Sequence, residues 1–286
     1  MRQINRILLC VSVSVSLCSM LTSCRLVPEK RDSVSDRAGR KGFESRQLEA
    51  GQFNLFVLYR GLETDAPLTV YVEGDGRGWR RKSGPPKDPT PKNPVALELA
   101  LLDQSSAVLY VARPCQWLDS EELAACSANY WANYRYAEEV IDSVNKAISW
   151  AISRSADSEP GRRVGMVGFS GGGTVAALVS ARRDDVDWLV SLSANLDHDA
   201  WTREGGLTAL SQSLNPTDFA DELAQIAQLH LIGNEDEIVP FSVLKSYSST
   251  LGGEQVKLEV HEGFDHSCCW EDIWPARLDS FIETVP

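Results

Sequence analysis

The sequence lacks several features that would each indicate a particular class of protein. It has no excess of positive charge, because 28 Lys and Arg stand against 40 Asp and Glu, a formal net charge of −12. It contains no Gly-Lys-Ser or Gly-Lys-Thr phosphate loop, and no Cys-x-x-Cys or His-x-x-x-His spacing. These absences argue against nucleic-acid binding, P-loop nucleotide binding and zinc binding. We expect no metal and no organic cofactor, and we interpret the negative charge as favouring solubility.

An apolar run near the N-terminus, residues 7–21, is too short for a comfortable membrane span. Arg2 and Arg6 precede it and small residues follow it, which predicts an export signal over residues 1–23. The sequence "LTSC" at 21–24 resembles the lipobox of bacterial lipoproteins, which implies cleavage before Cys24 and diacylation of its sulfur. An ordinary secretory signal with a chance cysteine is the alternative.

Removal of residues 1–23 takes away two basic residues and leaves 26 Lys and Arg against 40 Asp and Glu, a net charge of −14. Arg25 stands where the retention signal of inner-membrane lipoproteins typically has Asp, so the resemblance implies an outer-membrane anchor facing the periplasm. The charged segment 24–45 contains few large apolar residues and predicts a flexible tether. A single folded domain is expected over 46–286.

Four cysteines remain in the expected domain, an even number that suggests disulfides in an oxidising compartment. We favour a bridge between Cys115 and Cys126, because the short intervening loop is easily closed. Cys268 and Cys269 are adjacent, so they are expected either as buried thiols or as a vicinal bond.

Strand and helix patterns alternate along the domain. The strand patterns cover residues 53–60, 68–74, 107–113, 163–169, 187–195, 228–233 and 256–260, and the helical ones cover 136–154, 172–183, 241–251 and 273–284. Near-continuous apolar strands alternating with helices predict an α/β fold, a mainly parallel sheet of about eight strands with helices on both faces. The first two strands are expected to be a hairpin or neighbours. The polar segment 196–227 is either a cap or lid, or a crossover helix with ragged ends.

The sequence "GFSGG", Gly168 to Gly172, follows a strand and opens a helix. In that context, glycines around Ser170 allow a sharp turn that presents its hydroxyl, although a chance glycine turn is the alternative. Asp236 follows the strand 228–233, and His266 follows the strand 256–260. Serine, aspartate and histidine thus occur in the order expected of a nucleophile, an acid and a base that meet at one sheet edge.

That order and context resemble the α/β-hydrolase superfamily over about residues 50–285. The segments "EGDGRGW", "KDPTPKNP" and "ARPCQWL" are further similar to an uncharacterised bacterial lipoprotein branch of it. The resemblance implies Ser170 as nucleophile, His266 as general base and then acid, and Asp236 as the residue that orients His266.

Each of these assignments has a rival in the sequence. Asp197 competes with Asp236, because some members of the superfamily place the acid after the preceding strand. Asp265 is expected to be a turn residue, and His261 a core or surface histidine.

The resemblance also implies an oxyanion hole of two backbone N–H groups. One belongs to Gly171, and the other to Asp75 in the loop after residues 68–74, where Gly74 allows close approach. Glu73 stands where many relatives have histidine, which is a departure from the pattern of the superfamily.

Five further residues lie in loops that this fold directs toward the site: Arg77, Trp79, Arg113, Trp117 and Trp131. They are candidates for recognition of an acidic or planar substrate, with aromatic packing and structural ion pairs as the commoner explanation.

We expect a serine hydrolase of the cell envelope that cleaves a carboxylic ester, in preference to an amide, through an acyl-enzyme. Its partners would be a small-molecule or lipid-like acyl substrate and the membrane, with no nucleic acid. An acyltransferase and a noncatalytic binding scaffold on the same fold are the alternatives.

Overall fold

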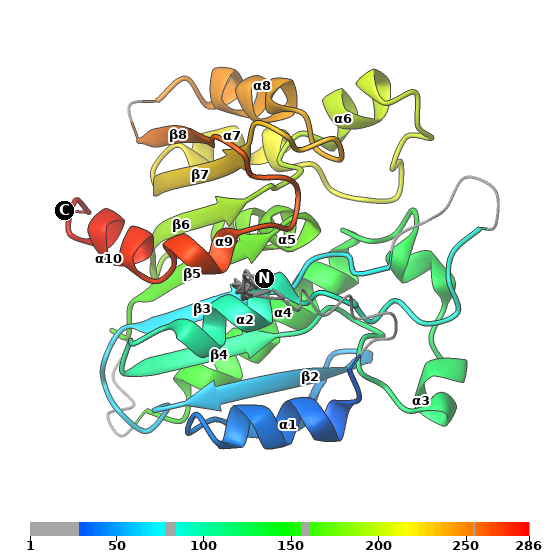
Figure 1. Cartoon of the computed structure of the whole chain (residues 1–286), viewed down its shortest axis with the longest axis vertical. Helices are drawn as coiled ribbons and strands as arrows, with labels where there is room; N and C mark the ends of the chain where they lie inside the picture. The colour runs from blue at the N-terminus through cyan, green and yellow to red at the C-terminus, as the bar shows by residue number, and fades with distance from the viewer. Residues whose placement is uncertain (1–28, 78–83, 156–160, 254, 286) are drawn as a thin grey trace, which may run out of the picture.

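Eight strands form one sheet in the order β1-β2-β4-β3-β5-β6-β7-β8 (Figure 1). The computed structural model describes residues 29–77, 84–155, 161–253 and 255–285. The strands are β1 (Glu44–Ala50), β2 (Phe53–Arg60), β3 (Leu68–Val72), β4 (Ala107–Val111), β5 (Val164–Phe169), β6 (Val186–Leu192), β7 (Ala227–Gly233) and β8 (Val256–His261). Pairing is antiparallel from β1 through β2 to β4 and parallel from β4 onward, which confirms the predicted fold class.

Helices cover both faces of the sheet, because alternate strand residues point to opposite sides. Leu55 and Val57 belong to one buried cluster and Phe56 and Leu58 to the other. The first face carries α4 (Glu138–Ile152), α5 (Gly171–Ser180) and α8 (Phe241–Leu251). The second carries α1 (Arg31–Gly39), α2 (Val95–Leu102), α9 (Trp270–Ile273) and α10 (Ala276–Ile282) (Figure 1).

The expected pairing of the first two predicted strands is wrong, because β4 lies between β2 and β3. All five residues of β3 are buried, a pattern that requires a partner strand on each side and a helix layer on each face. β3 therefore pairs in parallel with β4 and β5. The edge strand β1, which the sequence analysis did not predict, pairs with β2 instead.

The prediction of a flexible tether over 24–45 is wrong from residue 31 onward. Residues Arg31–Gly39 form α1, in which Val34 and Ala38 are fully buried against the domain. The two residues are four apart and so share one helix face, enough for a narrow apolar contact. Arg37 adds an ion pair to Glu98 of α2, with 2.7 Å between Nη1 and Oε2.

The predicted signal peptide and the lipidation site Cys24 lie outside the described residues. Within the described ranges, no helix combines the length and the apolar character needed to cross a membrane.

The segment 196–227 connects β6 to β7 through α6 (His198–Glu204), η2 (Pro216–Phe219) and α7 (Ala220–Leu223). α6 and α7 contact α8, and η2 contacts α5. Leu210 and Leu223 are buried in the cluster that contains α5. These contacts make the segment a packed crossover.

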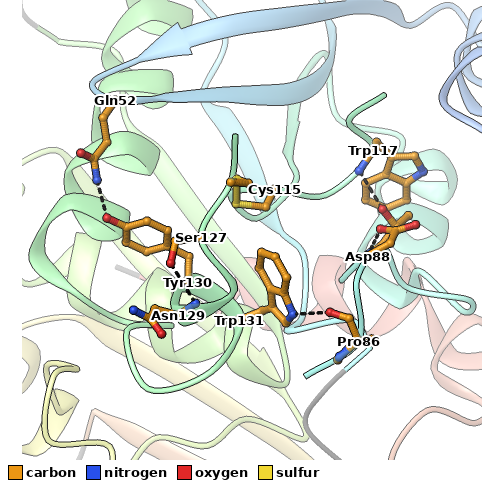
Figure 2. Close-up of a disulfide and its surroundings, with 11 residues drawn as sticks. Gln52, Pro86, Asp88, Cys115, Trp117, Ser127, Asn129, Tyr130 and Trp131 are labelled. Carbon is orange, nitrogen blue, oxygen red and sulfur yellow. Dashed lines mark hydrogen bonds between the residues drawn. A yellow bond between two sulfur atoms is a disulfide. The ribbon is translucent and has the colours of Figure 1, made fainter. Parts of the chain in front are cut away.

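A disulfide joins Cys115 to Cys126, as the loop length predicted, with 6.0 Å between the Cα atoms (Figure 2). The bridged loop contains α3 (Ser120–Ala124), and η1 (Ala128–Trp131) follows it. The indole of Trp131 donates to the carbonyl oxygen of Pro86 at 2.9 Å (Figure 2). Cys268 and Cys269 are bonded to each other, which is the vicinal alternative.

Candidate active site

Ser170 stands at the sharp turn between β5 and α5. Its backbone lies at φ 51° and ψ −127°, a conformation that L-residues rarely adopt, so the turn holds local strain. Gly168 makes the turn possible, because a Cβ there would lie 2.4 Å from the Cα of Gly173. The Ser170 N–H donates to the carbonyl oxygen of Leu192 at 2.8 Å, which ties the turn to the end of β6. Ser170 itself is half-buried.

The structure brings Ser170, His266 and Asp236 into one line of hydrogen bonds. His266 Nε2 lies 3.0 Å from Ser170 Oγ, and His266 Nδ1 lies 2.9 Å from Asp236 Oδ2. A carboxylate can only accept, so Nδ1 carries the proton toward Asp236 and Nε2 accepts from the Ser170 hydroxyl. The aromatic ring of Phe169 packs against the imidazole with 5.3 Å between ring centroids. This arrangement leaves Nε2 able to take a proton from Ser170.

The Asp236 carboxylate is inaccessible to solvent, with a side-chain exposure of 0%. Burial by itself raises the pKa of this carboxyl, but the hydrogen bond and charge of His266 and the backbone N–H of Val239 outweigh burial and hold the pKa below its ordinary value. The N–H of Val239 reaches Asp236 Oδ1 at 2.9 Å. Asp236 is therefore ionised and fixed opposite His266.

The rival residues have other partners. Asp197 caps α6 by accepting from the N–H of Ala200 at 3.0 Å, and it also accepts from the Ser246 hydroxyl at 2.6 Å. Asp265 accepts from the backbone N–H groups of the two residues that follow His266, as a turn residue does. His261 packs against Phe264 and Trp270. None of the three is hydrogen-bonded to Ser170 or His266 in the described ranges.

The two backbone N–H groups predicted for the oxyanion hole, those of Gly171 and Asp75, donate to no acceptor among the described residues. Gly171 is the first residue of α5, where an N–H has no partner within the helix and the helix dipole favours negative charge. The N–H of Gly74 is unavailable, because it donates to Glu73 Oε1 at 2.8 Å.

Glu73 is buried directly below this loop, with an exposure of 1%. Besides Gly74, its carboxyl accepts from the Leu97 N–H at 3.2 Å and from the Tyr110 hydroxyl at 3.1 Å. Burial raises its pKa to about 7, although these hydrogen bonds work in the opposite direction. Glu73, which stands where many relatives have histidine, thus supplies carboxylate oxygens that bind the backbone of the loop at Gly74 and connect it to Leu97 and Tyr110.

The side chain of Asp75 enters a buried charged cluster, which we call the Asp75 cluster: Asp75, Arg113, Arg135 and Tyr136. Arg113 Nη1 lies 2.8 Å from Oδ1 of Asp75, and Arg135 Nη1 lies 2.9 Å from Oδ2. Burial raises the pKa of Asp75, but the charges of Arg135 and Arg113 outweigh it and hold the pKa below its ordinary value. The sequence analysis missed Arg135 and Tyr136, for which the available signal was an arginine set among aromatic residues in "NYRYAEE".

The loop residues that were candidates for substrate recognition differ in their surroundings. Trp117 and Trp131 are buried, with exposures of 3% and 5%, and Arg113 pairs with Asp75. For these three, packing and ion pairing are the explanation that the structure supports. Arg77 is half-buried and bonds through its N–H to the Pro89 carbonyl at 2.9 Å, while Trp79 lies outside the described residues. No group of metal-ligating side chains occurs in the described part of the chain.

The strand order, the turn at Ser170 and the placement of Asp236 and His266 after β7 and β8 define the α/β-hydrolase fold. A family model, X-Pro dipeptidyl-peptidase (S15 family), matches residues 132–249. This family model and the solved structures below confirm the prediction of an α/β-hydrolase enzyme.

Several solved structures share the fold at low sequence identity. An esterase from Pyrococcus furiosus is 16% identical with a TM-score of 0.58, over 85% of this chain and 91% of that one. Est1E from Butyrivibrio proteoclasticus is 14% identical with a TM-score of 0.59, over 84% and 97%. An acylaminoacyl peptidase from Pyrococcus horikoshii is 16% identical with a TM-score of 0.58, over 85% of this chain and 42% of the longer peptidase. No curated protein matches the chain in sequence.

Proposed function

We propose that the protein is a serine hydrolase that cleaves a carboxylic ester, with Ser170 as nucleophile, His266 as general base and acid, and Asp236 as the group that orients His266. The observation that carries the proposal is the continuous hydrogen bonding from Ser170 Oγ through His266 to Asp236, at 3.0 and 2.9 Å. An ionised carboxylate at Nδ1 fixes the tautomer that leaves Nε2 free to accept a proton.

Acylation follows from this geometry. Ser170 Oγ attacks the ester carbonyl carbon while His266 Nε2 takes the hydroxyl proton. The carbonyl oxygen becomes negative and accepts hydrogen bonds from the N–H groups of Gly171 and Asp75. When the intermediate collapses, the carbon–oxygen bond to the alcohol breaks, and His266 returns its proton to the departing oxygen.

Deacylation repeats the same steps with water. His266 removes a proton from a water molecule, whose oxygen attacks the carbonyl carbon of the acylated Ser170. Collapse of the second intermediate breaks the bond to Oγ, releases the carboxylic acid and restores the Ser170 hydroxyl. An alcohol in place of water would make the protein an acyltransferase, so product analysis distinguishes the two activities.

A fluorophosphonate probe tests the nucleophile directly. The wild-type protein is expected to be labelled at Ser170, and Ser170→Ala is expected to lose the label while keeping its unfolding transition. A folded wild-type protein that takes no label would contradict the proposal and favour a binding scaffold. A series of p-nitrophenyl esters from short to long acyl chains then measures which chain length the site accepts.

Peptide cleavage is the second candidate, because the matching family model describes X-Pro dipeptidyl-peptidases. The ester series should therefore be run beside X-Pro peptide amides at equal concentration. Faster turnover of the esters supports the proposal, whereas faster turnover of the peptides would replace ester by amide as the substrate.

We further propose that the protein acts at the cell envelope as a lipid-anchored enzyme of the outer membrane that faces the periplasm. The proposal rests on the signal-like residues 1–23, on Cys24 in "LTSC", and on Arg25 after it. Cys24→Ser is expected to release the protein from membranes into the soluble fraction. Continued membrane association of this variant would contradict the anchor.

A further inference from the structure

The carboxylate of Asp75 is surrounded by donors from two other parts of the chain. Arg113, in the loop after β4, reaches Oδ1, and Arg135, shortly before α4, reaches Oδ2. The Tyr136 hydroxyl donates to Oδ2 at 3.1 Å. The side chains are exposed by 15% for Asp75, 4% for Arg113 and 10% for Arg135, so the cluster is almost entirely removed from solvent.

The two guanidinium groups are themselves held in place. Arg135 Nε donates to the carbonyl oxygen of Ala132 at 2.7 Å. Arg113 Nη2 donates to the carbonyl oxygen of Arg135, and its guanidinium lies over the Tyr136 ring at 5.4 Å from the centroid. The Asp75 carboxylate is therefore bound by side chains that cannot rotate without breaking further contacts.

Asp75 also touches the residue that follows the nucleophile. A Cβ at Gly171 would lie 2.1 Å from Asp75 Oδ1, so the carboxylate occupies the space above the Cα of Gly171. The N–H groups of Gly171 and Asp75 are the candidate oxyanion-hole donors, and neither has an acceptor among the described residues. One carboxylate thus fixes the spacing between the backbone segments that carry both donors.

Stability alone is a weak reason for such a cluster. Removing one carboxylate and two guanidinium groups from water is unfavourable, and their mutual attraction offsets this cost only when every donor is satisfied. Arg113 Nε is buried without an acceptor among the described residues. An incompletely satisfied ion cluster placed against Gly171, the residue after the candidate nucleophile, is better explained by precise placement of the site.

We propose that the Asp75 cluster positions the oxyanion hole: Arg113, Arg135 and Tyr136 hold the Asp75 carboxylate against Gly171, so that the N–H groups of residues 75 and 171 point to one place. This inference rests on the proposed hydrolase function. The members of the cluster act through the backbone of Asp75 and Gly171, and their side chains do not touch the substrate.

The direction in which Asp75→Asn changes the reaction rate distinguishes positioning from a simple charge effect. With two arginines and one aspartate, the cluster carries a net charge of +1, which would by itself favour an oxyanion. Asp75→Asn raises that charge to +2 while weakening the bonds that fix the loop. Positioning predicts a slower enzyme, whereas a pure charge effect predicts an equal or faster one.

The experiment compares Asp75→Asn, Arg135→Met, Arg135→Lys and Tyr136→Phe with the wild type on the best ester. Each is assayed for kcat, for KM and for inhibition by an aryl trifluoromethyl ketone, whose serine adduct carries an oxyanion. For Asp75→Asn and Arg135→Met we expect kcat to fall about 100-fold, of the order of losing one oxyanion donor. The ketone should bind more weakly by a similar factor, and KM should change less than about twofold. Arg135→Lys, which keeps the charge, should recover part of the loss.

Arg162→Met is the matched control, because Arg162 is also a buried arginine that bonds to backbone carbonyls, but at the opposite end of β5. We expect it to lose stability while keeping kcat and ketone affinity. Tyr136→Phe removes only one hydrogen bond from Asp75, so this variant should fold even if the variants that remove a charge do not. Its kcat should fall about three- to tenfold.

Unchanged kcat and ketone affinity in Asp75→Asn or Tyr136→Phe would overturn the inference. A parallel loss in Arg162→Met would also overturn it, since the effect would then follow stability. Failure of the proposed function looks different, because the wild type itself would then hydrolyse no ester and take no fluorophosphonate.

Discussion

Nε2 of His266 lies 3.0 Å from Oγ of Ser170, although the two residues are 96 positions apart in the chain. Ser170 follows β5 and His266 follows β8, both at the carboxyl ends of parallel strands. Parallel strands place these ends along one edge of the sheet, so the contact is a direct consequence of the topology.

Asp236→Asn should lower kcat by about 10⁴-fold with little change in the free energy of unfolding, because an amide at this position favours the wrong His266 tautomer. Steady-state kinetics and urea unfolding measure the two quantities. Asp197→Asn is the matched control: Asp197 caps α6 and asparagine caps a helix about equally well, so this change should have little effect on stability and leave kcat near the wild-type value. The reverse pattern would make Asp197 the acid.

Gly171→Ala should lower kcat by about 100-fold or more. The new Cβ would lie 2.1 Å from Asp75 Oδ1, so the carboxylate and the loop that carries it must move away from the candidate oxyanion hole. Active-site titration with a fluorophosphonate would count the folded sites, and the rate per site is the quantity to compare. A variant with the full wild-type rate per site would contradict the close contact between these two residues.

Glu73 should make stability fall as the pH rises. Its pKa is raised from 4.5 to about 7 in the folded protein, so its contribution is fully present below pH 4.5 and is lost as the pH rises through about 7. Glu73→Gln cannot ionise, so its stability relative to wild type should increase by about 3 kcal/mol between pH 4 and pH 8. Urea unfolding at several pH values checks this, and a difference that is flat with pH would contradict it.

Loss of the Cys115–Cys126 bridge should lower the free energy of unfolding by about 3 kcal/mol. The two cysteines are 11 positions apart, and cross-linking a loop of this size restricts the unfolded chain by about that amount. The double variant Cys115→Ser, Cys126→Ser would be compared with wild type by urea unfolding. Cys268→Ser, Cys269→Ser is the matched control with a smaller loss, because that bond closes no chain loop; equal losses would contradict the argument.

Local patterns in the sequence predicted most of the sheet. Strands β2 to β8 and helices α4, α5 and α8 follow from apolar runs, periodicity and glycine placement, which are properties of neighbouring residues. The strand β1 was not predicted because "ESRQLEA" contains few apolar residues. A strand at the edge of a sheet can form with little apolar surface. The helix α1 was not predicted for the same reason, since Val34 and Ala38 are its only buried residues.

The place of β3 could not be predicted in the same way. A hairpin and an interior position are both compatible with two apolar strands that follow each other, and the choice depends on which arrangement buries all five residues of β3. That choice puts β4 beside β2, and it also brings the loop after β4, with Arg113, next to Asp75.

The sequence by itself determined the fold class and the positions of Ser170, Asp236 and His266, because each residue stands in the turn or loop that follows a strand specified by local sequence. Only the tertiary structure decided the order of β2, β4 and β3 and the assembly of the Asp75 cluster. Asp75 is 38 positions from Arg113 and 60 from Arg135. Ion pairs between residues so far apart in the chain form only when the folded sheet brings the partners together and buries them. No local sequence pattern predicts such a contact.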